Sequence, residues 1–396
     1  MTTITKNRIE SIDVLRGLVM IIMALDHTRD YFHAQANVND PLDFATTTPA
    51  LFFTRWITHF CAPTFVFLSG VSIYLQGLRK TKPALSIFLI KRGLWLIFFE
   101  VFIVNLAMTF NPNFNLFILV VVWAIGISMV ILGLLVYLPF NIIFAIGLLI
   151  VFGHNLLDFQ EAAPDFKPNF WWDLLHHGYA ANYPILPNHS LLILYPFVPW
   201  LGLMIMGYCA GTFFTAKFSI EQRQKIFYRL GAGLLAFFIV VRFINFYGNP
   251  HAWSVQKNGL FTLFSFIKVH KYPPSLMYMS VTIGGAFLFL AFIEKFKNRF
   301  TDTLQIYGRT ALFYYAVHWY VIHTVSLICF LLRGHSMEED THFVQLPFRY
   351  LVPGEGFNLP IVYLVWLSVV IFMYPLCKWY DGYKQSHKEQ WWLSYL

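Results

Sequence analysis

The chain has 396 residues, of which 58% are hydrophobic and only 12% carry a charge. Soluble domains carry about 25% charged residues, so this composition predicts an integral membrane protein and excludes an ordinary soluble one. The net charge of +8 is therefore first a signal of membrane topology, and we expect no nucleic-acid partner.

Apolar stretches of about 20 residues are long enough to cross a bilayer as helices. We predict an all-α fold, a polytopic membrane helix bundle of about ten transmembrane helices with an eleventh left open, in a single membrane-embedded domain over residues 1–396. The expected spans cover residues 12–33, 51–78, 85–109, 116–137, 139–157, 190–214, 226–247, 274–295, 306–332 and 359–381.

Basic residues orient these spans, because Lys and Arg concentrate in loops on the cytoplasmic side of a membrane. Five cations surround the end of the second span and the start of the third: Arg79, Lys80, Lys82, Lys91 and Arg92. The opposite loops are acidic or mixed, so we expect both termini in the cytoplasm. Lys257, Lys268 and Lys271 are exceptions, because they fall on the predicted outer side.

The four cysteines, Cys61, Cys209, Cys329 and Cys377, fall inside apolar runs and lack metal-ligand spacing. They are typical of small core residues, so we expect no disulfide and no metal site. The segment before the first span is short and polar, which predicts no cleavable signal peptide.

The first predicted span, SIDVLRGLVMIIMALDHTRDYFH, carries an unusual number of ionisable residues. A stripe along one helix face is formed by residues at steps of three or four: Asp13, Arg16, Met20, Met23, His27 and Asp30. Ionisable groups inside a membrane are costly and are functional candidates by default. Ion pairs that lock the helix into the bundle are the alternative, and they account well for Asp13 with Arg16. The dense segment 26–30 favours a reactive site.

Further polar side chains are expected to bind substrate near this segment. Arg55 and His59 share one face of the second span, and Tyr314 and His318 repeat that spacing in the ninth. An interfacial arginine that reaches water explains Arg55 equally well. The substrate-binding candidates are Arg29, Arg55, His59, Lys271, Tyr272, Tyr314 and His318. Glu100 lies near the middle of the third span and needs a partner that the sequence does not name.

Two functions of different classes fit these residues. In acyl transfer, a neutral histidine takes a proton from an attacking amine or hydroxyl, and a carboxylate orients that histidine. The catalytic candidates are His27, His33, Asp30 and Asp26, with Asp30 three residues from either histidine. Acylation of the histidine itself is an alternative route.

Proton-coupled transport of a small polar or sugar-like solute is the second function, because such carriers also use Asp and His within helices. Transporters usually show two corresponding halves with a site near the midplane. Here the polar residues gather near one surface, and no second half mirrors them, so we favour acyl transfer.

Several blocks resemble the heparan-α-glucosaminide N-acetyltransferase-like membrane family, part of the transmembrane acyltransferase superfamily. They follow the family order: Ser11 to Leu18, Asp26 to His33, Phe65 to Ser72, Lys271 to Leu276, and Gly308 to His318. The resemblance implies an acetyltransferase that takes an acetyl group from cytoplasmic acetyl-CoA and passes it to an amine or hydroxyl of a glycan on the outer side.

The resemblance also carries expectations for individual residues. Together with the basic cluster, it leads us to expect acetyl-CoA at a cytoplasmic mouth formed by Asp13, Arg16, Arg79, Lys80, Lys91 and Arg92. Anionic lipid headgroups and membrane topology also explain such a cluster, and from the cations alone they are the favoured explanation. In the better-known branch an asparagine lies near the position of His27 and the essential histidine follows later, so His33 is the nearest match by order. Which histidine is the base stays open, as does N- versus O-acylation.

The lysosomal members have a sizeable domain before the first span, and we expect a bacterial-type member without it, in the inner (cytoplasmic) membrane. Its acceptor is then expected to differ from the heparan end-group. The expected partners are the lipid bilayer, acyl-CoA and a sugar or glycan acceptor, with a homodimer left open.

Overall fold

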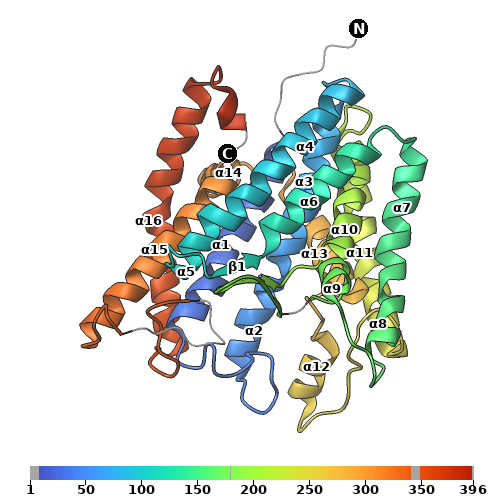
Figure 1. The fold of residues 1–396 in the computed structure, drawn as a ribbon. Coiled ribbons are helices and arrows are strands. Elements are labelled where there is room, and N and C mark those ends of the chain that lie inside the picture. Colours follow the sequence, from blue (N-terminus) through green and yellow to red (C-terminus); the bar gives the residue numbers. More distant parts are fainter. Residues whose placement is uncertain (1–8, 179, 340–347, 395–396) are drawn as a thin grey trace.

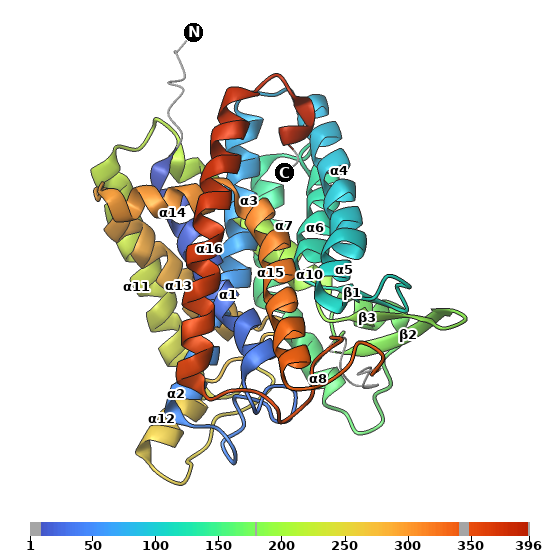
Figure 2. The same cartoon turned by 90° about the vertical axis from the view of Figure 1, so that its left-hand side faces the viewer.

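The computed structural model of the protein describes residues 9–178, 180–339 and 348–394. The helices stand side by side as a bundle, with long helices running between its two ends (Figure 1). α1 begins and α16 ends at one end, which we call the terminal end; α2 and α12 lie at the opposite end, which we call the loop end (Figure 1 and Figure 2). The α-helices are α1 (Glu10–Phe32), α2 (Pro49–Ile57), α3 (Cys61–Gly77), α4 (Lys82–Phe98), α5 (Asn105–Thr109), α6 (Val121–Leu135), α7 (Phe140–Gly153), α8 (Leu157–Glu161), α9 (Phe170–Leu175), α10 (Phe197–Ala210), α11 (Ile220–Ile244), α12 (Gly259–Ile267), α13 (Leu276–Ile293), α14 (Arg299–Arg309), α15 (Ala311–Leu332) and α16 (Leu359–Ser386).

Short helical segments of other types join some of these helices. The 3₁₀ segments are η1 (Thr58–Phe60), η3 (His154–Leu156), η4 (Gly211–Phe214) and η5 (Trp391–Ser394), and η2 (Phe99–Val104) is a π-helix between α4 and α5. Single π-helical turns are rare and often occur at functional sites.

The helices confirm a membrane bundle, but not the expected number of spans. Within the described residues, seven helical stretches are long and apolar enough to cross a membrane by length and composition. Three other segments that we expected to span do not match these seven in length or composition. α1 carries several charges, and α4 and α6 have only 17 and 15 residues. The count of about ten is therefore not confirmed.

A small sheet corrects the all-α prediction. β1 (Leu116–Leu119) pairs in parallel with β3 (His189–Ile193), and β2 (Ala181–Leu186) pairs antiparallel with β3, giving the order β1-β3-β2. The expected spans 116–137 and 190–214 thus each begin with a strand, and their helices start at Val121 and Phe197. A short apolar run has no periodicity that separates a strand from a buried helix.

The expected span 306–332 is also divided. Thr310 has a non-helical backbone conformation and separates α14 from α15. α14 lies across the terminal end of the bundle, whereas α15 runs along it (Figure 2). This break brings Arg309 to the terminal end of α15, where the cavity described below opens.

α1 is the central helix, because it packs against α3, α13, α14, α15 and α16. Its crossing with α14 is a direct contact of backbones. A Cβ atom on Gly17 would lie 1.8 Å from the carbonyl oxygen of Leu304, and one on Gly308 would lie 1.9 Å from that of Asp13. Small residues permit such close approaches between membrane helices.

Local sequence explains where the helices that carry the site begin. Thr48 caps α2 and is followed by Pro49, while Ser275 caps α13 by accepting the backbone N–H of Tyr278 at 3.1 Å. A cap of this kind contributes about 1 kcal/mol to helix stability. The Ser275 cap fixes the start of α13 directly after the turn that carries Lys271.

The close crossing of α1 and α14 yields a stability prediction. Gly17→Ala adds a methyl group where a backbone carbonyl already lies, and overpacking typically costs about 1–3 kcal/mol. We expect a lower midpoint of thermal unfolding in detergent, measured by intrinsic fluorescence. Gly233→Ala is the matched control, because nothing lies within 4 Å of its added Cβ and alanine favours the helix. Equal midpoints for Gly17→Ala and wild type would contradict the crossing.

Candidate functional site

A cavity of about 360 Å³ lies between α1, α3, α4, α6 and α15. Its lining is apolar along much of its length and positive toward the terminal end. Its lining includes Arg16, Met20, Met23, Arg92, Leu96, Ile125, Arg309, Tyr315 and Lys384. Ligand pockets commonly have volumes of about 300–1,000 Å³ and combine an apolar wall with a few polar groups.

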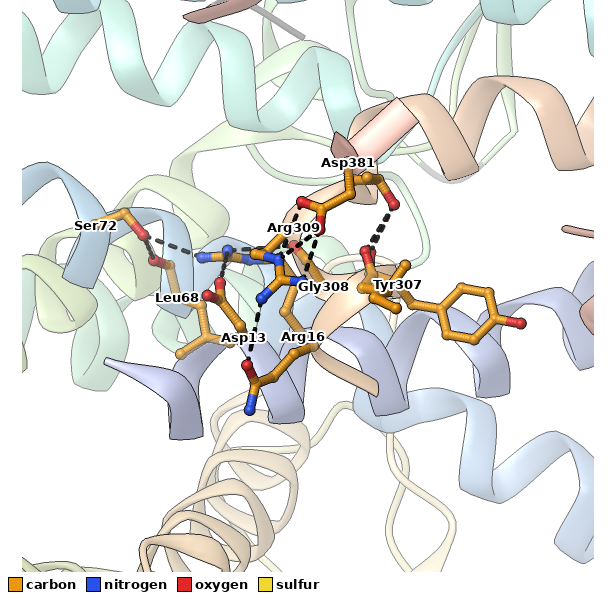
Figure 3. A network of polar contacts seen from close by, with 11 residues as sticks. Asp13, Arg16, Leu68, Ser72, Tyr307, Gly308, Arg309 and Asp381 are labelled. Carbon is orange, nitrogen blue, oxygen red and sulfur yellow. Dashed lines mark hydrogen bonds and ion pairs between the residues drawn. The ribbon is translucent and has the colours of Figure 1, made fainter. Parts of the chain in front are cut away.

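Hydrogen bonds and ion pairs hold two of the cavity arginines in place (Figure 3). Arg16 bonds the Asp13 carboxylate at 3.1 Å through Nη1 and the Ser72 hydroxyl at 3.1 Å through Nη2. Arg309 makes an ion pair with Asp381 in which Nη2 and Oδ2 lie 2.6 Å apart. These contacts preorganise two guanidinium groups in the cavity wall.

Only some of the cations expected at the acetyl-CoA mouth line this cavity. Arg16 and Arg92 line it, and Asp13 orients Arg16. Arg79, Lys80 and Lys91 are exposed and are not among its lining residues. Arg79 and Lys80 lie in the turn between α3 and α4, and Lys91 and Arg92 on α4 differ because neighbouring helical residues face different directions.

Two histidines from opposite parts of the chain meet beyond the cavity. Nδ1 of His27 on α1 lies 2.7 Å from Nε2 of His318 on α15, and the two rings are stacked. Along both helices the deepest lining residues, Met23 and Tyr315, precede this pair by three or four residues. At 1.5 Å per residue, the histidine pair therefore lies about 4.5–6 Å past them along the helix axes.

The hydrogen bonds of this pair define its tautomers. Nδ1 of His318 lies 2.9 Å from the carbonyl oxygen of Tyr314, and a carbonyl only accepts. Nδ1 of His318 must therefore carry the proton, and its Nε2 accepts from Nδ1–H of His27. This leaves the lone pair of neutral His27 on Nε2, the arrangement required of a general base.

Aromatic side chains hold His27 in this orientation. The ring of Trp319 stacks on His27 with the centroids 3.8 Å apart. Tyr314 contributes through its carbonyl group and by stacking on His318, while its hydroxyl is buried without a partner among the described residues. The expectation that Tyr314 binds substrate stays a prediction.

Glu100, whose partner the sequence did not name, lies behind the cavity wall. It is 1% exposed, and one carboxylate oxygen accepts the backbone N–H of Val122 at 3.1 Å, at the start of α6. Its other oxygen lies 3.4 Å from the hydroxyl of Tyr315, which lines the cavity. The π-helix η2 carries Glu100 to this position.

A largely buried charge cluster extends from beside His27 toward the loop end. Asp26 makes ion pairs with Arg29 at 2.9 Å and with Arg55 at 2.7 Å. Asp30 bonds Arg29 at 2.5 Å. In the described parts of the chain Asp30 forms no hydrogen bond with His27 or His33, so the expectation that it orients either imidazole is corrected: Arg29 takes that carboxylate.

The turn before α13 delivers Lys271 to the same cluster. Lys271 is 9% exposed, interacts electrostatically with Asp26 and His27, and lies with Nζ 5.1 Å from the centre of the Tyr272 ring. His270 Nε2–H donates to the carbonyl of Tyr272 at 2.7 Å and thereby closes the turn. Burial lowers the pKa of His270 to about 4, so at neutral pH it adds no charge beside Lys271.

His59 and His33 occupy different surroundings. His59 is 2% exposed, packs edge-on against Tyr278, and has no partner for its Nδ1 among the described residues. His33 ends α1 and forms a backbone bridge with Phe357. His33 also lines a small pocket at the loop end, with Arg333 and Glu355.

Sequence reasoning named His27 and His318 separately but did not pair them. It missed Arg309, Trp319 and Lys384 as members of the site, although the Tyr315–Trp319 spacing on one helix face was a usable signal. Arg309 offered no such signal, since only the break at Thr310 turns it toward the cavity.

Comparison with known proteins gives a family match. The profile of the family described as heparan-alpha-glucosaminide N-acetyltransferase, catalytic, matches residues 8–241, which cover α1 to most of α11. Lys271 and His318 lie beyond the matched region. No curated protein matches the sequence. Because the match covers more than half of the chain, this multi-pass membrane protein belongs to the heparan-α-glucosaminide N-acetyltransferase catalytic family, which implies an enzyme of the acetyltransferase type.

Proposed function

We propose that the protein transfers an acetyl group from acetyl-CoA to an amine or hydroxyl of a sugar, with His27 as the general base. The observation that carries this proposal is the His27–His318 pair, because its hydrogen bonds leave a lone pair on His27 Nε2 just beyond the cavity. A neutral imidazole with one nitrogen anchored is suited to take a proton from an attacking nucleophile.

The cavity supports a donor that is anionic at one end and apolar at the other. Four cationic side chains line its wall: Arg16, Arg92, Arg309 and Lys384. Guanidinium groups match phosphate oxygens in geometry and charge. The phosphates of acetyl-CoA are then held by these cations, and the pantetheine arm runs past Met20 and Met23 toward His27.

The charge cluster supports stabilisation of the transition state. Three cations, Arg29, Arg55 and Lys271, face two carboxylates, Asp26 and Asp30, so one positive charge is left over if all five are ionised. A fixed positive charge in a water-poor site stabilises an oxyanion far better than it does in water. Lys271 has no carboxylate within ion-pair distance among the described residues and is the best placed of the three.

In the proposed transfer, the acceptor N–H or O–H gives its proton to His27 Nε2 while the acceptor atom bonds to the thioester carbonyl carbon, and the carbonyl oxygen becomes an oxyanion. The oxyanion then re-forms the carbonyl, the C–S bond breaks, and the CoA sulfur leaves with the proton from His27. His318 holds the His27 ring throughout and shares the positive charge of the imidazolium.

The positive-inside rule supports the orientation of this reaction. Basic residues gather in the segments at the terminal end, such as Lys80 and Lys82 around the start of α4 and Lys295 and Lys297 before α14. The terminal end is then cytoplasmic, which gives the cavity access to acetyl-CoA, and the acceptor arrives at the loop end. A bacterial inner membrane is the location that we propose.

The decisive experiment uses the purified protein in liposomes with radiolabelled acetyl-CoA and a panel of amino sugars and neutral sugars. Acetylated sugar identified by mass spectrometry supports the proposal, and hydrolysis without a sugar product contradicts it. An acetyl mass found on His27 when the acceptor is omitted would replace direct transfer by an acyl-enzyme route.

Removal of the base tests the assignment of His27. We expect His27→Gln to lower kcat on the order of 100-fold or more, because a positioned general base contributes about 10²–10⁴-fold. His189→Gln, at the start of β3, is the control and should retain the rate. Full turnover by His27→Gln would show that the base lies elsewhere.

His318 is predicted to act through His27. We expect His318→Gln to lower kcat about tenfold, equal to about 1.4 kcal/mol of barrier, with the KM for acetyl-CoA unchanged. The double variant with His27→Gln should be no slower than His27→Gln alone, because residues that act as a unit are not additive. Additive losses in the double variant would refute the coupling.

The cavity cations are predicted to read the phosphates of the donor. We expect Arg92→Gln with Lys384→Gln to raise the KM for acetyl-CoA at least tenfold, or about 1.4 kcal/mol, while the KM for acetyl-pantetheine, which lacks the nucleotide, stays unchanged. Arg79→Gln with Lys80→Gln is the matched control, because both side chains lie outside the cavity. A larger effect of the control pair would move the donor to the exposed cluster.

A further inference from the structure

Away from the proposed transfer site, the connection that follows α7 gathers metal-ligating side chains. Asp158 and Glu161 on α8 and His176 just after α9 have ligand atoms that all lie within 4.8 Å of one another. His176 is 2% exposed, and both carboxylates are partly buried. The proposed acetyl transfer uses none of these residues.

We propose that Asp158, Glu161 and His176 bind a divalent metal ion of the zinc type on the loop-end side of the bundle. Zinc sites commonly combine imidazole nitrogen with carboxylate oxygen and can add water as a fourth ligand. Calcium and magnesium prefer oxygen ligands only, so the buried imidazole favours a transition metal.

The charge of the cluster supports a cation. Two carboxylates lie beside a buried imidazole, and over residues 9–178, 180–339 and 348–394 neither carboxylate forms an ion pair with a lysine or arginine. Buried charges need a partner or a metal, because desolvation of an unpaired charge is costly. A divalent ion neutralises the two carboxylates.

Each proposed ligand also has a hydrogen-bond partner outside the trio. Asn155 donates to Asp158 at 2.7 Å, and Trp172 donates to Glu161 at 2.8 Å through Nε1. Such outer contacts orient the ligands of metal sites and are a regular part of them.

The histidine pair at the cluster fits the same interpretation. His154 is 5% exposed, directs Nδ1 to Nε2 of His176 at 3.0 Å, and has no partner for its own Nε2 in the described chain. With the metal on Nδ1 of His176, Nε2–H donates to His154. His176 Nδ1 and the Glu161 carboxylate lie 2.7 Å apart. With the metal bound, both coordinate the ion in place of this direct contact.

The position of the cluster gives the ion a structural role. Besides its bond to Asp158, Asn155 accepts the backbone N–H of Leu276, the first residue of α13, at 2.8 Å. The metal therefore ties α8 and α9 together next to the turn that carries Lys271. This role does not depend on the proposed acetyl transfer.

Metal content of the full-length protein tests the proposal. Protein purified in detergent without a histidine tag is incubated with zinc chloride and desalted. Its zinc content is then measured by inductively coupled plasma mass spectrometry. We expect one tightly held zinc per chain and a higher unfolding midpoint with zinc, since a ligand that binds the folded state stabilises it. Wild-type protein without bound zinc would overturn the proposal.

The ligands are tested by isosteric variants. We expect Glu161→Gln and Asp158→Asn to weaken zinc binding at least tenfold and to remove the rise in unfolding midpoint. His177→Gln is the control, because His177 is next to His176 but pairs with Asp173. Unchanged zinc binding in Glu161→Gln would refute the site.

Spectroscopy of the wild-type protein gives a test that needs no variant. Zinc-edge X-ray absorption should show nitrogen and oxygen ligands with one imidazole. A sulfur ligand, or two or more imidazoles, would place the zinc elsewhere and overturn the assignment.

Discussion

The burial of ionisable groups along α1 is the constraint on which the rest of the structure depends. A charge taken out of water costs several kcal/mol unless it is paired, so each charged residue on this central helix needs a partner on another element or nearby on the same helix. Arg16 forms an ion pair with Asp13 and a hydrogen bond with Ser72, and Asp26 forms ion pairs with Arg29 and Arg55. These contacts tie α1 to α3 and α2, and they leave polar groups where an apolar core would otherwise form.

This constraint divides the bundle into three levels along α1. The positively lined cavity lies toward the terminal end, the His27–His318 pair lies beyond it, and the charge cluster extends from beside His27 toward the loop end. In the transfer that we propose, this histidine lies between the cavity that binds acetyl-CoA and the end of the bundle that the acceptor approaches. The hydrogen bond to His318 also fixes the tautomer of His27, and thus leaves the lone pair of His27 on Nε2.

The fold was predictable where the chain has long, strongly apolar stretches, as in α11, α13 and α16. It was not predictable in residues 116–119 and 190–193, because a run of four or five apolar residues fits a strand and a buried helix equally well. The strands form only because β1 and β3 meet across about 70 residues of chain and satisfy each other's backbone hydrogen bonds. The break at Thr310 is a similar case, since it depends on α14 packing across α1.

The sequence by itself determined that the protein is a helical membrane protein and that α1 carries a stripe of functional candidates, since composition and periodicity are local properties of the chain. It also named His27, His318, Arg16 and Arg92 as single candidates. Only the tertiary structure decided that His27 pairs with a residue 291 positions away, that Asp30 goes to Arg29, and that Arg79 and Lys80 stay outside the cavity. The physical reason is that these pairings depend on which helix faces pack together. A single sequence does not show which residues far apart in the chain come into contact.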